Sequence, residues 1–313
     1  DRQVGFTFRK MKRCTFIVGV LLFFPAFLAS GERLRVLIID GQNNHTVWPR
    51  STRMMQVYLE ESGRFEVAIA RTVYTWRGET WLPHYPLEDG VERQNLPEPR
   101  PDPEFQPDFA AYDVVVSNFG WKAAEWPEAT RRALEHYVSE GGGFVTVHAA
   151  NNCFPEWTAY NRMIGLGGWG GRNESDGPYV YFDTEGQLVR DPSPGPAGSH
   201  GPQHEFLITI REPDHPVTRD MPRQWLHTRD ECYDRLRGPA EEMTILATAF
   251  SSPEFRGTGR HEPILMVVRF GKGRIFHTTL GHEDYSFEGV GFITSFLRGA
   301  EWAATGQVTL PIP

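Results

Sequence analysis

The feature that most constrains the fold of this chain is a repeated alternation of short apolar strands with amphipathic helices. Residues 34–40 form a continuous apolar run, which is typical of a strand covered on both faces of a parallel sheet. A helical pattern follows over 51–62, with Ser51 as its expected N-cap, and a second one runs over 127–140 before three glycines. This βαβ order predicts an α/β fold with a mainly parallel, doubly wound sheet.

The rest of the chain continues the pattern, and we expect one domain over residues 32–313. Further strands are expected at 65–70, 113–117, 144–148, 204–211, 243–250, 264–270 and 274–279, and a last helix at about 290–304. Gly271-Lys272-Gly273 is predicted to join the last two strands as a hairpin. Two Pro-rich stretches, near 75–108 and 191–202, contain little that packs and are predicted to be surface insertions.

Residues 1–31 have the pattern of a secretory signal peptide. Lys12 and Arg13 precede an apolar run over 15–27, and small residues suited to cleavage follow at 29–31. Residues 1–10 precede Met11, which would make them an over-extended start. We therefore expect an exported protein, periplasmic or extracellular, without stable membrane insertion after cleavage. The alternative is an anchor formed by the uncleaved N-terminal segment.

The charge balance argues against nucleic acid as a partner. The formal net charge is -8, and the lysines and arginines form no basic stripe. Proteins that bind nucleic acid neutralise phosphates with clustered basic side chains. A small molecule is the expected partner.

Polar side chains follow several of the predicted strands at the points where these strands end. They are Asp40, Asn43, Asn44 and His45 after the first strand, Asn118 after the third, His148, Asn151 and Asn152 after the fourth, and His282, Glu283 and Asp284 after the last. In open α/β sheets, ligands bind at the carboxyl ends of the strands. A single histidine is more often structural than functional, but recurrence at one edge predicts a site there.

A GxGxxG match at residues 165–170 is not interpreted as a phosphate loop. It follows a predicted helix and opens no new one, whereas a dinucleotide fingerprint lies between the first strand and its helix. A flexible pocket wall, with Trp169 as a stacking platform, is the better interpretation.

Several motifs occur in a fixed order along the chain. They are GGGFVTVHAA with His148, HEFLITI with His204, Asp214-His215-Pro216, Asp230-Glu231-Cys232-Tyr233, Gly271-Lys272-Gly273-Arg274 with Thr279-Leu280-Gly281-His282, and Glu301-Trp302-Ala303. The set resembles the ThuA-like (trehalose utilisation) family over residues 34–306. This resemblance implies a flavodoxin-like, class I glutamine amidotransferase-like three-layer sandwich and an association with sugar breakdown.

The related glutamine amidotransferases place a Cys nucleophile at a sharp strand-to-helix elbow, paired with a late His. Here His148 occupies the elbow position, and Cys153 lies five residues further on. The late His is matched by His282, but without a thiol at the elbow we exclude glutamine hydrolysis. Cys153 and Cys232 either form a disulfide or remain buried free thiols.

Two chemical interpretations of the site stay open. In the first, His148 and His282 act as catalytic acid and base, with Glu231 orienting one of them. In the second, His148, His204 and His282 bind a divalent metal, zinc or manganese. Substrate contacts are expected from His45, Asn44, Asn118, Trp121, Asn151, Trp169 and Tyr233.

Two functions fit these residues. One is a carbohydrate-active enzyme that works on a sugar or keto-sugar, and the other is a non-catalytic carbohydrate-binding or accessory module. A glycosidase with two catalytic carboxylates fits less well, because histidines dominate the candidate edge. Trehalose itself is not assumed to be the substrate.

Overall fold

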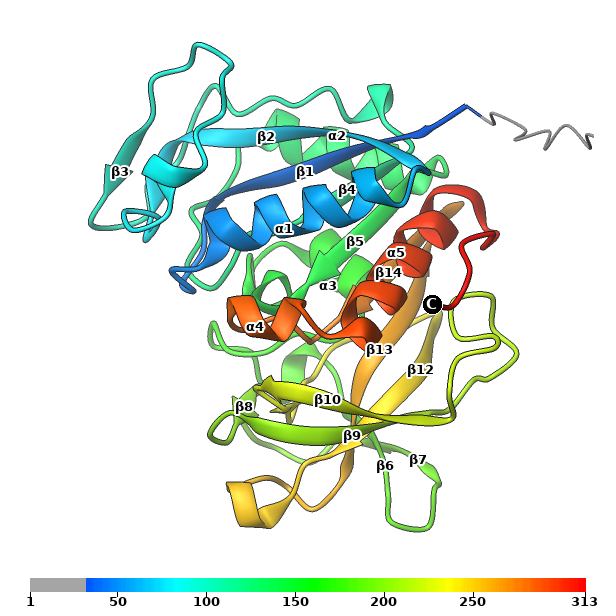
Figure 1. Ribbon diagram of the computed structural model, residues 1–313. Helices are drawn as coiled ribbons and strands as arrows, with labels where there is room; N and C mark the ends of the chain where they lie inside the picture. Colours follow the sequence, from blue (N-terminus) through cyan, green and yellow to red (C-terminus); the bar gives the residue numbers. More distant parts are fainter. Residues whose placement is uncertain (1–31) are drawn as a thin grey trace, which may run out of the picture. The chain divides into compact units, whose positions relative to one another are not determined.

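A mixed sheet forms the centre of the structure (Figure 1). The computed structural model describes residues 32–313, so the predicted signal peptide over 1–31 lies outside the described residues. Within the described part, the central sheet has 12 strands, and ten of them follow the order β10-β9-β12-β13-β14-β5-β4-β1-β2-β3.

One half of the sheet is parallel and carries the predicted βαβ units. Its strands are β1 (Leu34–Gln42), β2 (Phe65–Trp76), β3 (Gln94–Leu96), β4 (Val114–Ser117), β5 (Gly143–Val147) and β14 (Gly273–Thr278). Val36 pairs with Val114, and Phe144 pairs with Ile275, in parallel register. Because these strands are parallel, their carboxyl ends meet at one edge.

The other half of the sheet is antiparallel and begins at the hairpin predicted around Gly271. Its strands are β13 (His261–Phe270), β12 (Met243–Phe250), β9 (His204–Ile210) and β10 (Gln224–Asp230). In addition, β6 (Tyr179–Phe182) pairs with β13, and β7 (Leu188–Asp191) pairs with β6. A separate two-stranded sheet pairs β8 (Ser199–His200) with β11 (Tyr233–Asp234).

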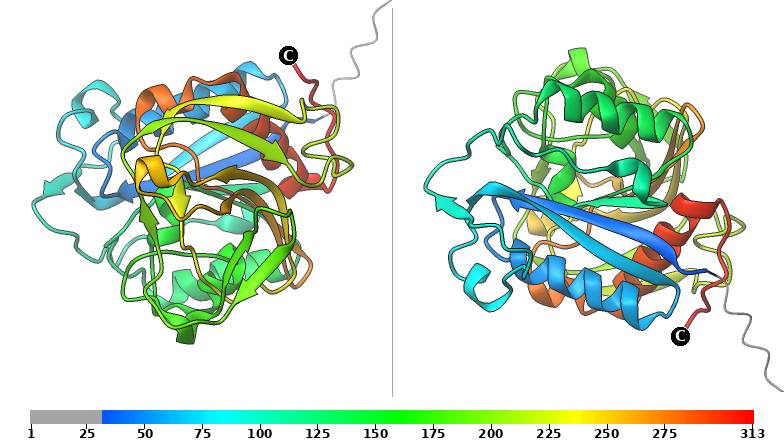
Figure 2. Two further views of the ribbon diagram at one scale, coloured as in Figure 1. Left: turned by 90° about the horizontal axis from the view of Figure 1, so that it is seen from below. Right: turned by 90° about the horizontal axis from the view of Figure 1, so that it is seen from above.

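Helices cover both faces of the parallel half, which gives the three layers of the predicted α/β fold (Figure 2). The α-helices are α1 (Trp48–Glu61), α2 (Glu128–Ser139), α3 (Thr158–Ile164), α4 (Asp284–Phe287) and α5 (Val290–Thr305). The 3-10 helices are η1 (Leu82–His84), η2 (Phe109–Ala111), η3 (His148–Asn152), η4 (Glu174–Asp176) and η5 (Pro253–Phe255). Val36 and Ile38 pack on the side of α1 and α5, whereas Leu37 and Ile39 pack on the side of α2 and α3.

The predicted start of the first helix is wrong by three residues. The helix begins at Trp48 with Pro49 in its first turn, whose fixed φ suits that position. Ser51 is therefore inside the helix, where its hydroxyl donates to the carbonyl of Trp48 at 3.2 Å. The earlier start shortens the loop after β1 and keeps His45 close to the sheet edge.

Gly41 lets the chain leave β1 towards this loop. Its φ is +133°, and a Cβ built on it would lie 2.0 Å from Oγ1 of Thr72. Only glycine is tolerated at such a close approach in this backbone region. β2 runs six residues beyond its predicted end at residue 70, so the insertion near 75–108 begins inside this strand.

Both cysteines of the described part are buried free thiols, as one of the two alternatives predicted. The thiol of Cys153 donates to the carbonyl of Gly120 at 3.0 Å. Burial raises the pKa of Cys153 well above its ordinary value, so the sulfur stays protonated and is not a nucleophile.

Residues 33–313 form a single compact unit. Among the described residues, no helix combines the length and the apolar character needed to cross a bilayer.

Glu262, on β13, is a buried carboxyl whose titration is expected to affect stability. Burial raises its pKa from 4.5 to about 7, and Asp234 adds to the effect. The folded chain therefore binds this proton more tightly than the unfolded chain. As a result, the free energy of unfolding is highest below about pH 4.5 and falls as the pH rises through 7. Glu262→Gln removes this loss. We expect its free energy of unfolding to exceed that of the wild type by up to about 3 kcal/mol at pH 8 and by little at pH 5.

Urea unfolding at both pH values measures the effect, with the exposed Glu254→Gln as the control. Equal differences at pH 5 and pH 8 would contradict the assignment to Glu262.

Candidate metal centre

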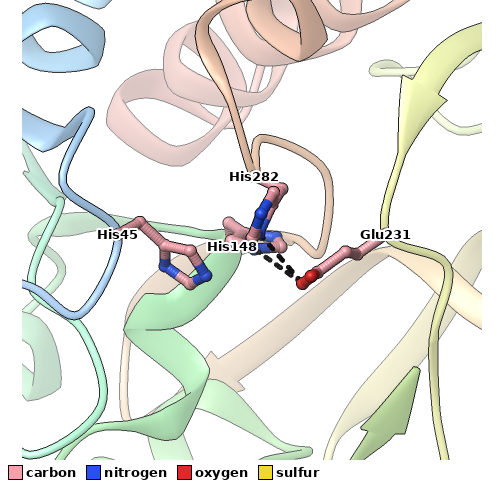
Figure 3. Close-up of side chains that lie close together, drawn as sticks. All are labelled: His45, His148, Glu231 and His282. Carbon is pink, nitrogen blue, oxygen red and sulfur yellow. Dashed lines mark ion pairs between the residues drawn. The ribbon is translucent and has the colours of Figure 1, made fainter. Parts of the chain in front are cut away.

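Four side chains from different parts of the chain converge at the carboxyl edge of the sheet (Figure 3). His45 follows β1, His148 follows β5, Glu231 follows β10 and His282 lies in the loop between β14 and α4. Each offers one ligand atom, and these four atoms all lie within 4.8 Å of one another. Three imidazoles and one carboxylate are a common donor set for a divalent metal.

His148 occupies the base of the cluster with a defined tautomer. Its backbone has φ 48°, a conformation that non-glycine residues adopt rarely and mainly at functional sites. Nδ1 lies 2.6 Å from the carbonyl oxygen of Thr279, which can only accept, so Nδ1 carries the proton. The lone pair on Nε2 faces the cluster and accepts from the Tyr233 hydroxyl at 2.9 Å.

His45 is oriented in the same way by Asn43. The amide nitrogen of Asn43 donates to the carbonyls of Asn118 and Phe119, which fixes its Oδ1 as the atom facing His45. That oxygen accepts from the backbone N–H of His45 at 2.9 Å and from its Nδ1 at 3.2 Å. The lone pair of His45 is therefore on Nε2.

His282 and Glu231 complete the cluster. Nδ1 of His282 lies 3.0 Å from Oε2 of Glu231, and the same oxygen is 3.7 Å from Nε2 of His148. Nδ1 of His282 is buried, and among the described residues it forms an ion pair with Glu231 but no hydrogen bond. These two nitrogens and the carboxylate oxygen therefore lie close enough together to share one ion.

The three imidazoles lie close together, and the charged form is disfavoured in two of them, His45 and His148. Ring centroids lie 4.8 Å apart for His45 and His148, and 4.6 Å apart for His45 and His282. Burial is the main cause that holds the pKa of His45 and of His148 well below the usual range, and a neighbouring imidazole adds to it: His282 beside His45, and His45 beside His148. Burial also lowers the pKa of His282, but Glu231 outweighs this and leaves it raised. His45 and His148 thus present neutral imidazoles, the form that binds metals.

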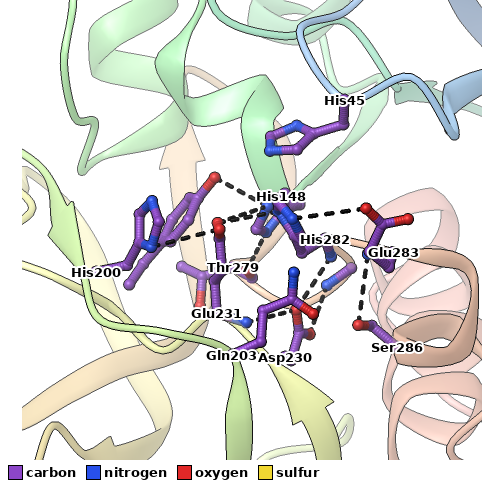
Figure 4. Close-up of polar contacts among 12 residues, drawn as sticks. His45, His148, His200, Gln203, Asp230, Glu231, Thr279, His282, Glu283 and Ser286 are labelled. Atoms are coloured by element: carbon purple, nitrogen blue, oxygen red, sulfur yellow. Dashed lines mark hydrogen bonds and ion pairs between the residues drawn. The ribbon is translucent and has the colours of Figure 1, made fainter. Parts of the chain in front are cut away.

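A pocket of about 380 Å³ opens above the cluster. It is lined by Asn44, His45, Trp121, Asn152, Trp169, His200, Glu231, Tyr233 and His282. Figure 4 shows the polar contacts around the cluster, including the pair of His200 Nδ1 and Glu231 Oε1 at 3.3 Å. Asn152 is 3% exposed, and its Oδ1 has no hydrogen-bond partner within the described residues. An unpaired buried acceptor in a pocket wall indicates a ligand hydroxyl or a water as its partner.

Comparison with known proteins confirms the family resemblance that the order of the motifs predicted. A sequence model of the ThuA family, described as trehalose utilisation, matches residues 91–303. The chain belongs to the ThuA family. This ThuA-family protein is 41% identical to a ThuA-like protein from Parabacteroides merdae, with a TM-score of 0.79 over 90% of this chain and 94% of the other. A ThuA-like protein from Bacteroides uniformis is 18% identical, with a TM-score of 0.54 over 91% and 97%, and shows the same fold. No curated protein sequence matches this chain.

Most of the residues predicted for the site of this ThuA-family protein lie at the cluster or its pocket. His148, His282 and Glu231, predicted as catalytic, lie within the cluster. Predicted substrate contacts that line the pocket are Asn44, His45, Trp121, Trp169 and Tyr233. His45, expected to contact substrate, is also one of the four candidate metal ligands.

The predicted metal set of His148, His204 and His282 needs one correction, because His204 lies outside the cluster. It is the first residue of β9, and its ring stacks on Phe255 with centroids 3.8 Å apart. Its Nδ1 donates to the carbonyl of Pro202 at 2.9 Å. The ring is therefore engaged outside the cluster, and His45 takes the place that the sequence analysis gave to His204.

Asn118 and Asn151 do not line the pocket. The amide of Asn118 donates to Trp48 O, Ser51 Oγ and Thr52 Oγ1, which ties β4 to α1. The amide of Asn151 lies 3.0 Å from Nε2 of His277, and the residue is fully buried. Both asparagines therefore form buried contacts that stabilise this edge of the sheet.

The sequence analysis missed His200 as a site residue and left Asn152 out of the predicted substrate contacts. His200 lies in the insertion predicted near 191–202, where β8 brings it beside Tyr233 through pairing with β11. Nothing in the composition of that loop marks this histidine. Asn151 and Asn152 both follow the predicted fourth strand. The structure has the 3-10 helix η3 at this point, and this turn places Asn152, rather than Asn151, at the pocket. A helical turn expected after the strand would have given the same result.

Proposed function

We propose that this ThuA-family protein is a metal-dependent enzyme that acts on a carbohydrate bound in the pocket above the cluster. The observation that carries the proposal is the convergence of the four ligand atoms of His45, His148, Glu231 and His282. The family description, trehalose utilisation, supports a sugar as the ligand.

The residues fit a divalent ion better than metal-free acid–base chemistry. Two imidazoles have their protons fixed on the far nitrogen by Thr279 O and Asn43 Oδ1, as outer partners of metal-binding histidines commonly do. The buried Nδ1 of His282 has no hydrogen bond within the described residues and lies beside Oε2 of Glu231, so both atoms are available to one ion. The nitrogen-rich donor set suits zinc, and manganese is the alternative.

A divalent ion held there would polarise a carbonyl or hydroxyl oxygen of the sugar as a Lewis acid. The protein supplies the surrounding contacts. Nδ1 of His200 donates to the carbonyl of Gly201 at 2.8 Å, which leaves its Nε2 to accept a hydrogen bond from a ligand hydroxyl. Oδ1 of Asn152 would accept from a second hydroxyl. The hydroxyl of Tyr233 donates to Nε2 of His148, and an ion bound to that nitrogen would free this O–H to donate to a ligand oxygen.

Two tryptophans in the pocket wall support a sugar ring as the ligand. Trp121 and Trp169 both line the pocket, and Trp169 packs edge-on against Tyr233 with centroids 4.8 Å apart. Trp169 has φ 56°, so the backbone is strained where it presents this side chain. Aromatic faces paired with polar groups suit a ring that carries both C–H faces and hydroxyls.

The pattern of residues 1–31 supports export, so we propose that the enzyme meets its substrate outside the cytoplasm. Fractionation of cells that express the full chain tests this, because a protein retained in the cytoplasm would contradict it.

Metal removal tests the proposed function. The purified chain, supplied with zinc or manganese, is incubated with neutral sugars, their keto forms and trehalose, and products are followed by NMR. We expect turnover of at least one sugar, its loss after chelation and its recovery when the metal is returned. Turnover that survives chelation would contradict the metal, and sugar binding measured by calorimetry without any turnover would favour the non-catalytic module.

A further inference from the structure

A fully buried carboxylate lies directly beneath two of the four cluster residues (Figure 4). Asp230 is the last residue of β10 and precedes Glu231. Its Oδ1 accepts from the backbone N–H of Glu231 at 2.8 Å and from that of His282 at 3.1 Å. Its Oδ2 accepts from the backbone N–H of Gly281 at 2.9 Å and from Nε2 of His227 at 2.9 Å.

We infer that Asp230 is the positioning residue of the metal centre, because one carboxylate fixes the backbone of two ligands that come from different loops. This inference rests on the proposed function. Glu231 directly follows β10, whereas His282 lies between β14 and α4, more than fifty residues later. The facing atoms of these two ligands, Nδ1 and Oε2, are 3.0 Å apart, and Asp230 sets that separation from below.

His227 holds the carboxylate in place. It lies three residues before Asp230, is 1% exposed, and donates from Nε2 to Oδ2. A second contact joins the same two loops, because the hydroxyl of Ser286 donates to the carbonyl of Arg229 at 3.0 Å. The loops therefore remain tied when Asp230 is changed, while the orientation of the two ligands is lost.

Asp230→Asn keeps the size of the side chain and removes half of its acceptors. Each carboxylate oxygen of Asp230 accepts two hydrogen bonds. In the variant one of these oxygens becomes an NH₂ group, which would face two N–H donors and could not accept from them. Loss of outer partners of metal ligands typically weakens metal affinity 10- to 100-fold. We expect a loss of about that size for zinc, measured by competition with a chromophoric chelator.

Glu301→Gln is the matched control. Glu301 is also fully buried, and it likewise accepts four hydrogen bonds, from Arg64 Nε, Thr309 N, Thr309 Oγ1 and Leu310 N. It lies on α5 and contacts none of the four ligands. We expect this variant to lose stability in urea unfolding and to bind zinc within about twofold of the wild type, which separates positioning from general destabilisation.

His227→Leu is the second variant, for the case in which Asp230→Asn does not fold. It removes one donor to Oδ2 and is expected to weaken zinc binding several-fold. Zinc affinity equal to that of the wild type in either folded variant overturns the inference, and so does an equal loss in Glu301→Gln. A wild-type chain that binds no zinc or manganese contradicts the proposed function itself, and is distinguished from these outcomes by the wild-type measurement.

Discussion

His148→Ala is expected to abolish turnover while sugar binding stays measurable. The substitution removes a proposed metal ligand whose Nε2 faces the cluster and whose Nδ1 is fixed by the carbonyl of Thr279. The loss of turnover is expected to be of order 10²-fold or more, because a ligand of the proposed ion is removed, and loss of an outer partner of a metal ligand alone typically costs 10- to 100-fold. His148 does not line the pocket, whose walls are built by residues such as Trp121 and Trp169, so the sugar keeps most of its contacts.

His204→Ala is the control, because its ring stacks on Phe255 outside the cluster. We expect this variant to keep wild-type turnover and wild-type metal content. Product formation followed by NMR and sugar binding followed by calorimetry check the two variants side by side. Near-normal turnover in His148→Ala would contradict the role given to this residue.

Arg172→Met is expected to cause the largest loss of stability. The guanidinium of Arg172 is buried and has no carboxylate partner within residues 32–313. It donates instead to the carbonyls of Cys153 at 2.6 Å and Gly168 at 2.9 Å. Two further bonds reach Oδ1 of Asn161, at 3.0 and 2.8 Å. Methionine fills the space but leaves these acceptors unpaired, at a cost of about 1–3 kcal/mol for each buried group. We expect a total loss of about 3–5 kcal/mol in urea unfolding.

The same substitution is expected to weaken sugar binding, because Arg172 ties the segment before Trp169 to the turn that carries Asn152. Arg172→Lys should lose nearly as much, since an ammonium group cannot reproduce the planar fork of donors. Arg162→Ala is the control. Its ion pair with Glu241 is exposed, and such pairs contribute about 1 kcal/mol or less. Equal losses in Arg172→Met and Arg162→Ala would contradict the account.

The sequence predicted the parallel half of the fold well, because strands buried on both faces are continuous apolar runs. The errors occurred where local signals compete. Ser51 is a good capping residue, but Pro49 starts the helix earlier. Residues 71–76 are mixed in polarity and did not suggest a strand, although β2 continues through them at the edge where the insertion begins.

The cluster itself was largely predictable, because the strand-end rule draws attention to His45, His148 and His282. His204 was assigned wrongly, because its place in a family-like motif says nothing about the direction of its ring. The structure pairs its backbone with Asp230 in the sheet, yet the ring turns to Phe255. His200 was missed, because only the pairing of β8 with β11 brings it to Glu231.

The most direct test of the metal centre is elemental mass spectrometry of the purified wild-type protein after incubation with zinc or manganese and desalting. We predict about one divalent ion per chain, lost in His148→Ala and His282→Ala and retained in His204→Ala. A wild-type protein that retains no metal would contradict the central claim.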